Sequence, residues 1–236
     1  MAMDTDVTVG QLVAERPSRA RVFEKLGIDY CCGGKLPLAR ACEERGIAAD
    51  EVRRQLEDQD RRNTDTSERD WRSANLRDLC DHIEQRHHAK LKEELPRLEF
   101  LTGKIARVHG KRHPELIELY HLFQLFKSDM EAHMHKEEQI LFPLCRNLET
   151  GGAADAPMSI ERPVAVMVHE HEDAGRDLAR IRELTHDYAV PADGCGTWRA
   201  TYGGLAELEA DLHQHVHKEN NILFPKAIAL EKTLTT

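Results

Sequence analysis

Two histidine–glutamate pairs at helical spacing are the residues of this chain best suited to chemistry: His133 with Glu137, and His215 with Glu219. They begin two nearly identical segments, HMHKEEQILFP and HVHKENNILFP. Residues four apart share one face of a helix, so each segment points an imidazole and a carboxylate in the same direction. Two such helices packed together would form a metal site in which carboxylates bridge two ions.

Four long helical patterns follow Trp71, and the segments between them carry the glycine and proline of turns. No strand-like alternation competes with them. We therefore expect an all-α fold in which residues 71–236 form an up-down-up-down four-helix bundle. The expected helices cover residues 74–109, 114–146, 161–187 and 197–230.

The first part of the chain has a different pattern. Residues 1–58 carry short apolar repeats interrupted by glycine, which predict a small helical N-terminal domain. Residues 59–70 contain no apolar side chain and are predicted to be a linker between this domain and the bundle.

The apolar stripe of each helix predicts which of the 14 histidines face inward. In the second helix, apolar residues spaced four and three apart lead into His133 and Glu137 and continue to Ile140. A similar stripe in the fourth helix leads into His215 and Glu219. Three histidines lie off these stripes and are expected to face solvent: His135, His213 and His217.

The other two helices each add one histidine. His171 lies on the stripe of the third helix, whereas His169 does not. In the first helix the apolar residues before the pair lead into His87, but those after it continue the row of His88. We choose His88. His109 lies roughly 30 Å further along the same helix, at a corner of the bundle, and is left out.

The chosen side chains fall at one level of the bundle, within about a turn, at a rise of about 1.5 Å per residue. A single buried His–Glu pair can be purely structural. Here, however, no basic residue on the stripes would neutralise the carboxylates, and an unpaired buried carboxylate is costly. Mixed nitrogen and oxygen donors with bridging carboxylates suit two irons better than a tetrahedral zinc. The predicted ligands are His88, His133, Glu137, His171, His215 and Glu219.

Composition narrows the possible partners and compartment. The formal net charge of -9 argues against nucleic-acid binding, which requires a basic face. No apolar run approaches the ~18 residues of a membrane span, and the acidic start, MAMDTDVTVG, is unlike a secretory signal. We expect a cytoplasmic protein whose six scattered cysteines stay reduced. The absence of a CxxC pair gives no support to a zinc ribbon.

Adjacent cysteines, Cys31 and Cys32, form a second candidate site in the segment DYCCGGK. A disulfide between neighbours closes a strained ring, so a structural bridge is not expected. Gly33 and Gly34 precede a helix start near Pro37, where the helix dipole can lower the pKa of a thiol. The pair is either a reactive dithiol that passes electrons, NO or metal, or one buried cysteine beside an incidental one.

Taken together, these segments resemble the hemerythrin-like HHE bundles, and more closely the repair-of-iron-centres family. The resemblance covers nearly the whole chain and rests on DYCCGGK, DWRSA, RVHG, HMHKEEQILFP, EHEDAG and ENNILFP. It implies a non-haem di-iron centre, held by the six predicted ligands, that repairs iron–sulfur clusters damaged by nitric oxide or oxidative stress. Damaged iron–sulfur proteins would be the partners, NO or O₂ the small ligands, and a homodimer the assembly.

Two other functions stay open at this stage. A hemerythrin-like carrier or sensor of O₂ or NO would need the same bundle but has no use for a dithiol. Ferritin-like oxidases place ExxH motifs on their helices, whereas the order here is HxxxE. Catalytic reduction of NO at the di-iron site is a separate alternative that the resemblance leaves open. Finally, Phe142–Pro143 and Phe224–Pro225 are expected to end the second and fourth helices.

Overall fold

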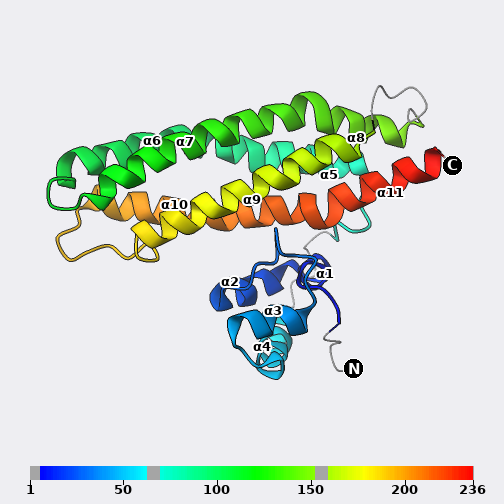
Figure 1. Ribbon diagram of the computed structural model, residues 1–236, viewed down its shortest axis with the longest axis horizontal. Coiled ribbons are helices and arrows are strands. Elements are labelled where there is room, and N and C mark those ends of the chain that lie inside the picture. Colours follow the sequence, from blue (N-terminus) through cyan, green and yellow to red (C-terminus); the bar gives the residue numbers. More distant parts are fainter. Residues whose placement is uncertain (1–5, 63–69, 152–158, 236) are drawn as a thin grey trace.

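The computed structural model describes residues 6–62, 70–151 and 159–235, and every regular element among them is a helix (Figure 1). A long bundle lies above a small N-terminal domain, which packs beneath the middle of the bundle (Figure 1). The all-α expectation is confirmed. In these described ranges, no helix is both long and apolar enough to cross a membrane.

Short helices build the N-terminal domain: α1 (Val9–Glu15), the 3₁₀ turn η1 (Pro17–Arg19), α2 (Ala20–Leu26), α3 (Leu38–Arg45) and α4 (Ala49–Arg62). Gly27 and Gly46 end α2 and α3 with a φ of 66°, a left-handed conformation that favours glycine.

Helix α4 extends to Arg62, four residues into the segment predicted to be a linker. Its last turns are held by Arg19, whose buried guanidinium donates hydrogen bonds of 3.1 and 2.8 Å to Asp60. This contact explains why polar residues stay helical there. Residues 63–69 of the predicted linker lie outside the described residues.

Four rods form the bundle, and their limits agree closely with the four expected helices. The first rod is α5 (Leu76–His82), η2 (Ile83–His88) and α6 (Ala89–His109); the second is α7 (Glu115–Lys136), η3 (Glu137–Leu141) and α8 (Phe142–Glu149). The third rod is α9 (Glu161–Leu184); the fourth is α10 (Gly196–Lys218), η5 (Glu219–Leu223) and α11 (Phe224–Leu234). Figure 1 shows the rods lying side by side along their length.

Three of the rods contain a π-helical segment, η2, η3 and η5, each inserting an extra residue into an otherwise α-helical rod. The prediction that the Phe–Pro pairs end their helices is wrong. Pro143 and Pro225 instead follow a π segment at the start of α8 and α11, where a missing N–H is tolerated.

The extra residue also shifts the apolar stripe. Ile140, expected on the inner face, is 49% exposed, and the next residue, Leu141, is buried in its place. The same shift explains the competition in the first rod. The α-helical row leads into His87, but η2 adds one residue, so His88 takes the inward position at the end of the segment.

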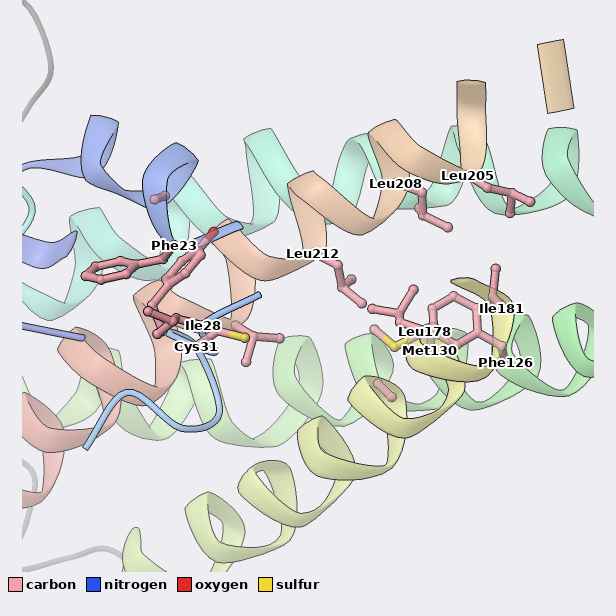
Figure 2. Packing of buried hydrophobic residues seen from close by; sticks show 14 of the residues in the cluster. Phe23, Ile28, Cys31, Phe126, Met130, Leu178, Ile181, Leu205, Leu208 and Leu212 are labelled. Carbon is pink, nitrogen blue, oxygen red and sulfur yellow. The ribbon is translucent and has the colours of Figure 1, made fainter. Parts of the chain in front are cut away.

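Aliphatic and aromatic side chains fill the space between the rods. Figure 2 shows Phe126 and Met130 of α7 facing Leu178 and Ile181 of α9, with leucines of α10 above them. Fully burying one such side chain contributes roughly 1.5–3 kcal/mol. Phe23, Ile28 and Cys31 of the N-terminal domain belong to the same apolar cluster, so that domain is fixed against the bundle.

Candidate metal centre

The six predicted ligands come together in the bundle, and all six are buried. They form two groups of four in which the donor atoms lie within 4.8 Å of one another. One group is His88, Glu137, His215 and Glu219, and the other is His133, Glu137, His171 and Glu219. Both groups therefore share the two carboxylates, and each adds its own pair of imidazoles.

Glu137 connects the groups on one side. Its Oε2 lies 3.3 Å from His88 Nε2 and 3.3 Å from His133 Nε2. Glu219 does so on the other side, with Oε1 2.8 Å from His215 Nε2 and Oε2 3.1 Å from His171 Nε2. This is the arrangement that a pair of bridging carboxylates requires.

Within each group, two imidazole nitrogens face each other. The Nε2 atoms of His88 and His215 lie 3.2 Å apart, as do those of His133 and His171. Two nitrogens bound at about 2.1 Å to one cation, roughly at a right angle, are about 3 Å apart. The spacing in each group therefore fits a shared cation.

The carboxylates give the strongest test of fit. Both side-chain oxygens of Glu137 and Oε2 of Glu219 are buried without a hydrogen-bond partner. Among the described residues, only imidazoles form ion pairs with them, and no lysine or arginine does. A buried carboxylate without a donor costs several kcal/mol unless a cation satisfies it. The residues present fit a pair of bound cations.

The electrostatics favour the charged form of Glu219. Burial opposes ionisation of Glu219, but the electrostatic attraction of the neighbouring His215 and His171 imidazoles holds its pKa well below the usual range. Burial lowers the pKa of His215 to about 4. Burial also lowers the pKa of His171, but the neighbouring Glu219 outweighs this effect and raises the pKa to about 9. An ionised Glu219 and a neutral His215 are the forms that bind metal, whereas His171 must release its proton to become a ligand.

Outer partners orient two of the imidazoles through carboxylates. His88 Nδ1 lies 2.8 Å from Glu138 Oε1, and Lys92 in turn holds Glu138. His133 Nδ1 lies 2.9 Å from Glu170 Oε2, and this hydrogen bond lowers the pKa of Glu170 to about 2. Such partners fix the tautomer that presents Nε2 to a metal and raise the basicity of the ligand.

The remaining two imidazoles differ from each other. His171 Nδ1 lies 2.9 Å from the amide oxygen of Asn220. His215 Nδ1 is buried with no hydrogen-bond partner, and the ring of His87 stacks parallel to it at 5.4 Å. Thus three of the four imidazoles are oriented by an acceptor and the fourth by packing.

Sequence reasoning missed Asn220 and misplaced His217. His217, expected in solvent, is buried with Nδ1 3.3 Å from the carbonyl oxygen of Tyr30, because the N-terminal domain covers it. His213 is half-buried beside the same tyrosine. The repeated segments did contain a signal: Asn220 occupies the position of Glu138, and both side chains bind a histidine of another rod.

The adjacent cysteines lie beside the metal centre. Cys32 Sγ is 3.6 Å from the backbone oxygen of His171. The two sulfurs are 4.0 Å apart and free. A hydrogen bond from Cys31 lowers the pKa of the Cys32 thiol, whereas the same hydrogen bond and burial raise that of Cys31.

His109 lies far from these groups, at the end of α6. Its Nε2 is 3.3 Å from Cys195 Sγ, and its ring packs against Trp198 at the start of α10. This is the corner position that its distance along the helix predicted. His135 and His169 are exposed, as expected.

Comparisons with known proteins agree with this architecture. Residues 5–60 match the ScdA_N family, described as a domain of unknown function (DUF542), and residues 81–227 match the Hemerythrin HHE cation binding domain. The chain is 39% identical over 223 residues to the iron–sulfur cluster repair protein YtfE of Pectobacterium carotovorum, covering 94% of this chain and 97% of that one.

Two further relatives cover almost the same length. The YtfE protein of Escherichia coli is 37% identical over 226 residues, 96% of this chain and 98% of its own. A probable iron–sulfur cluster repair protein of Haemophilus influenzae is 34% identical over 220 residues, 93% and 96% of the two chains. Because both domain models match and these relatives are similar over nearly the whole length, the chain belongs to the family of hemerythrin-like iron–sulfur cluster repair proteins.

Proposed function

We propose that this protein holds two iron ions in the bundle and uses them to repair damaged iron–sulfur clusters in other proteins. The observation that carries the proposal is the pair of buried carboxylates, Glu137 and Glu219, each in contact with an imidazole from both groups. They would bridge the ions, with His88 and His215 on one and His133 and His171 on the other.

The donor set supports iron over zinc. Each ion would receive two nitrogens and two carboxylate oxygens, and shared carboxylates in a helical bundle are typical of di-iron and di-manganese sites. Structural zinc prefers a closed tetrahedral shell of its own, often with thiolates. Here no cysteine side chain belongs to either group of donors among the described residues.

Repair follows from the relatives, whose names describe iron–sulfur cluster repair. Iron bound in this way supplies a metal that can be given to a damaged cluster and a centre that can bind NO or O₂. The protein's own part is to orient the ligands and to keep the site dry. Glu138, Glu170 and Asn220 fix three of the imidazoles, and the apolar side chains between the rods exclude bulk water. Damaged iron–sulfur proteins are the proposed partners.

The compartment we propose is the cytoplasm. All six cysteines are free thiols, which is the state that a reducing cytoplasm maintains. Iron–sulfur clusters damaged there by nitric oxide or oxidative stress would be the substrates. A protein that only carries O₂ or NO would have no use for the adjacent thiols of Cys31 and Cys32.

The test combines metal analysis with a repair assay. Purified protein should contain two irons per chain by mass spectrometry and Mössbauer spectroscopy, and should restore activity to an enzyme whose [4Fe–4S] cluster was destroyed by NO. Glu219→Ala should lose the iron and the repair activity. One zinc per chain in place of iron would contradict the proposal.

A matched control separates the site from general effects of charge. Glu172→Gln removes an exposed carboxylate from α9, one residue after His171. It should keep both irons and full repair activity. Circular dichroism of both variants should show that the helices are retained. Repair by Glu219→Ala at the unsubstituted rate would mean that the bundle iron takes no part in it.

A further inference from the structure

Outside the six-residue centre, the described residues contain one more group that could hold a metal: Asp29, Cys31 and Cys32. Their donor atoms lie within 4.8 Å of one another. Cys31 Sγ is 3.2 Å from Asp29 Oδ1 and 4.0 Å from Cys32 Sγ. Two thiolates bound at about 2.3 Å to a tetrahedral metal are about 3.8 Å apart, so the two sulfurs are already near the required spacing.

The turn that carries these donors is fixed by the backbone. The carboxylate of Asp29 accepts hydrogen bonds from the N–H groups of Cys31, Cys32 and Gly33 at 2.9–3.0 Å. This arrangement folds the chain back, so that neighbouring cysteines and an acid two residues earlier face one point. It also leaves the fourth position of a tetrahedral shell without a protein ligand.

The bundle anchors the turn from the other side. Asn221 donates to the carbonyl oxygen of Cys31 at 3.0 Å. A Cβ on Gly34 or Gly10 would lie 2.2 or 2.4 Å from the Asn221 side chain, so this close approach needs glycine at both positions. Asn221 belongs to η5, which begins with Glu219. The residue that anchors the cysteine turn therefore lies in the same helical segment as Glu219, a proposed bridging ligand.

The cysteine turn also contacts His171 of α9, another proposed metal ligand. Cys32 Sγ lies 3.6 Å from the backbone oxygen of His171, and a Cβ on Gly175, one turn further along α9, would be 4.0 Å from that sulfur. A Cβ there would be in ordinary van der Waals contact, so the sulfur lies directly against α9. The dithiol thus lies at the backbone of a proposed iron ligand while Asp29 is exposed at the surface.

We propose that Asp29, Cys31 and Cys32 form a second metal site, which takes a thiophilic divalent cation and passes ferrous iron between the bundle and a client protein. Binding releases one proton from each thiol and forms two metal–sulfur bonds, with Asp29 as third ligand and the open position for the incoming acceptor. No electron transfer is needed. The relay role rests on the proposed di-iron function; the metal site itself does not.

Cadmium is the probe for the site. Full-length, iron-loaded protein titrated with Cd²⁺ under reducing conditions should bind one equivalent with a thiolate-to-metal absorption band. Cys31→Ser and Cys32→Ser should each abolish the band. Asp29→Asn keeps an oxygen for the backbone N–H groups and should weaken Cd²⁺ binding while the band remains. Cys195→Ser, at the other end of α10, is the matched control and should leave binding unchanged.

The relay is tested by iron release from the same proteins to a ferrous chelator and to an apo iron–sulfur acceptor. The Cys31→Ser/Cys32→Ser double variant should keep two irons per chain and release them several-fold more slowly to the acceptor. A band that survives either serine variant overturns the second metal site. Normal iron content with unchanged transfer overturns the relay alone, whereas fewer than two irons in the unsubstituted protein contradicts the di-iron function instead.

Discussion

The two halves of the proposed di-iron centre have the same types of ligand, two imidazoles and two shared carboxylates, but different surroundings. In the His133/His171 half, both imidazoles have an outer acceptor, Glu170 and Asn220. In the His88/His215 half, only His88 has one, and His215 Nδ1 is buried without a partner. Because outer acceptors strengthen an imidazole ligand, the His133/His171 half should bind its ion more tightly at equilibrium.

The two halves also differ in how a cation can reach them from solvent. A cavity of about 260 Å³ reaches His133 between α7 and α9, and its lining includes Asp129, Asp173 and Asp177. On the other side, a cleft of about 980 Å³ lies between the domains, and its lining residue His87 separates it from His215. Basic side chains outnumber acidic ones in this lining: Arg21, Arg62, Arg86 and Lys218 against Glu24 and Asp211. An acidic wall concentrates cations and a basic wall repels them.

The difference teaches that two metal positions with the same types of ligand can differ in affinity for their ions and in access to them. The half with the more complete outer contacts also has the acidic cavity and, through the backbone of His171, the cysteine turn. We therefore expect iron to enter and leave at the His133/His171 half, while the His88/His215 half keeps its ion. Substitutions can separate the affinity of each half for iron from the path by which iron enters and leaves.

The largest effect is expected from a shared ligand. Glu137 belongs to both halves, so Glu137→Ala should remove both irons, whereas His88→Ala, which affects one half, should leave about one. Iron content by mass spectrometry checks this difference, with circular dichroism as the control for folding. If Glu137→Ala and His88→Ala lost the same amount of iron, the carboxylate would not bridge the halves.

The order of iron release should follow the route rather than the outer contacts. Limited treatment with a chelator should first remove the ion at His133 and His171. Anomalous scattering from crystals of the partly depleted protein should then show the remaining iron between His88 and His215. Loss in the reverse order would mean that the missing acceptor at His215 decides which ion moves.

Much of this comparison was accessible from the sequence, because the ligands interrupt apolar stripes of period 3.5. The stripes identified all six side chains that meet in the bundle, and the distance from His88 along its helix placed His109 at the corner. What the stripes could not show was the extra residue in η2, η3 and η5. It moves Ile140 outward and lets the helices continue through Pro143 and Pro225.

Contacts between domains were also beyond the sequence pattern. His217 lies off the stripe of its own helix, which predicts solvent, but Tyr30 of the N-terminal domain covers it. The stripe of a helix reports only on its contacts with its own bundle. Asn221, which donates to Cys31 of the N-terminal domain, was missed for the same reason. Asn220 contacts His171 within the bundle and was missed because polar residues off a stripe are normally solvated.

Removing an outer acceptor should make the two halves alike. Asn220→Leu keeps the size of the side chain but deprives His171 Nδ1 of its acceptor. Affinity for the ion in the His133/His171 half should fall by about 10–100-fold, measured by competition with a chromophoric chelator. Asn220→Asp, which restores a stronger acceptor, should regain the affinity. Equal affinities in all three proteins would show that the outer acceptor has no influence.

A smaller effect is expected on the rate of iron loading through the acidic cavity. Burial and the charge of Asp129 raise the pKa of Asp177, so this carboxylate takes up a proton at a higher pH than an ordinary aspartate. As the pH falls through that raised pKa, the cavity loses negative charge and loading of ferrous iron into apoprotein should slow. Asp177→Asn should load about tenfold more slowly at low salt and lose most of this pH dependence, with iron content unchanged.

The control for the loading rate is a substitution of a basic side chain in the interdomain cleft. Arg86 lines the interdomain cleft, and Arg86→Gln should leave stopped-flow loading rates unchanged if iron enters beside His133. Because the effect of Asp177 is electrostatic, added salt should bring the Asp177→Asn variant and the unsubstituted protein together. Faster loading in Arg86→Gln, with no change in Asp177→Asn, would move the route to the interdomain cleft and reverse the comparison between the two halves.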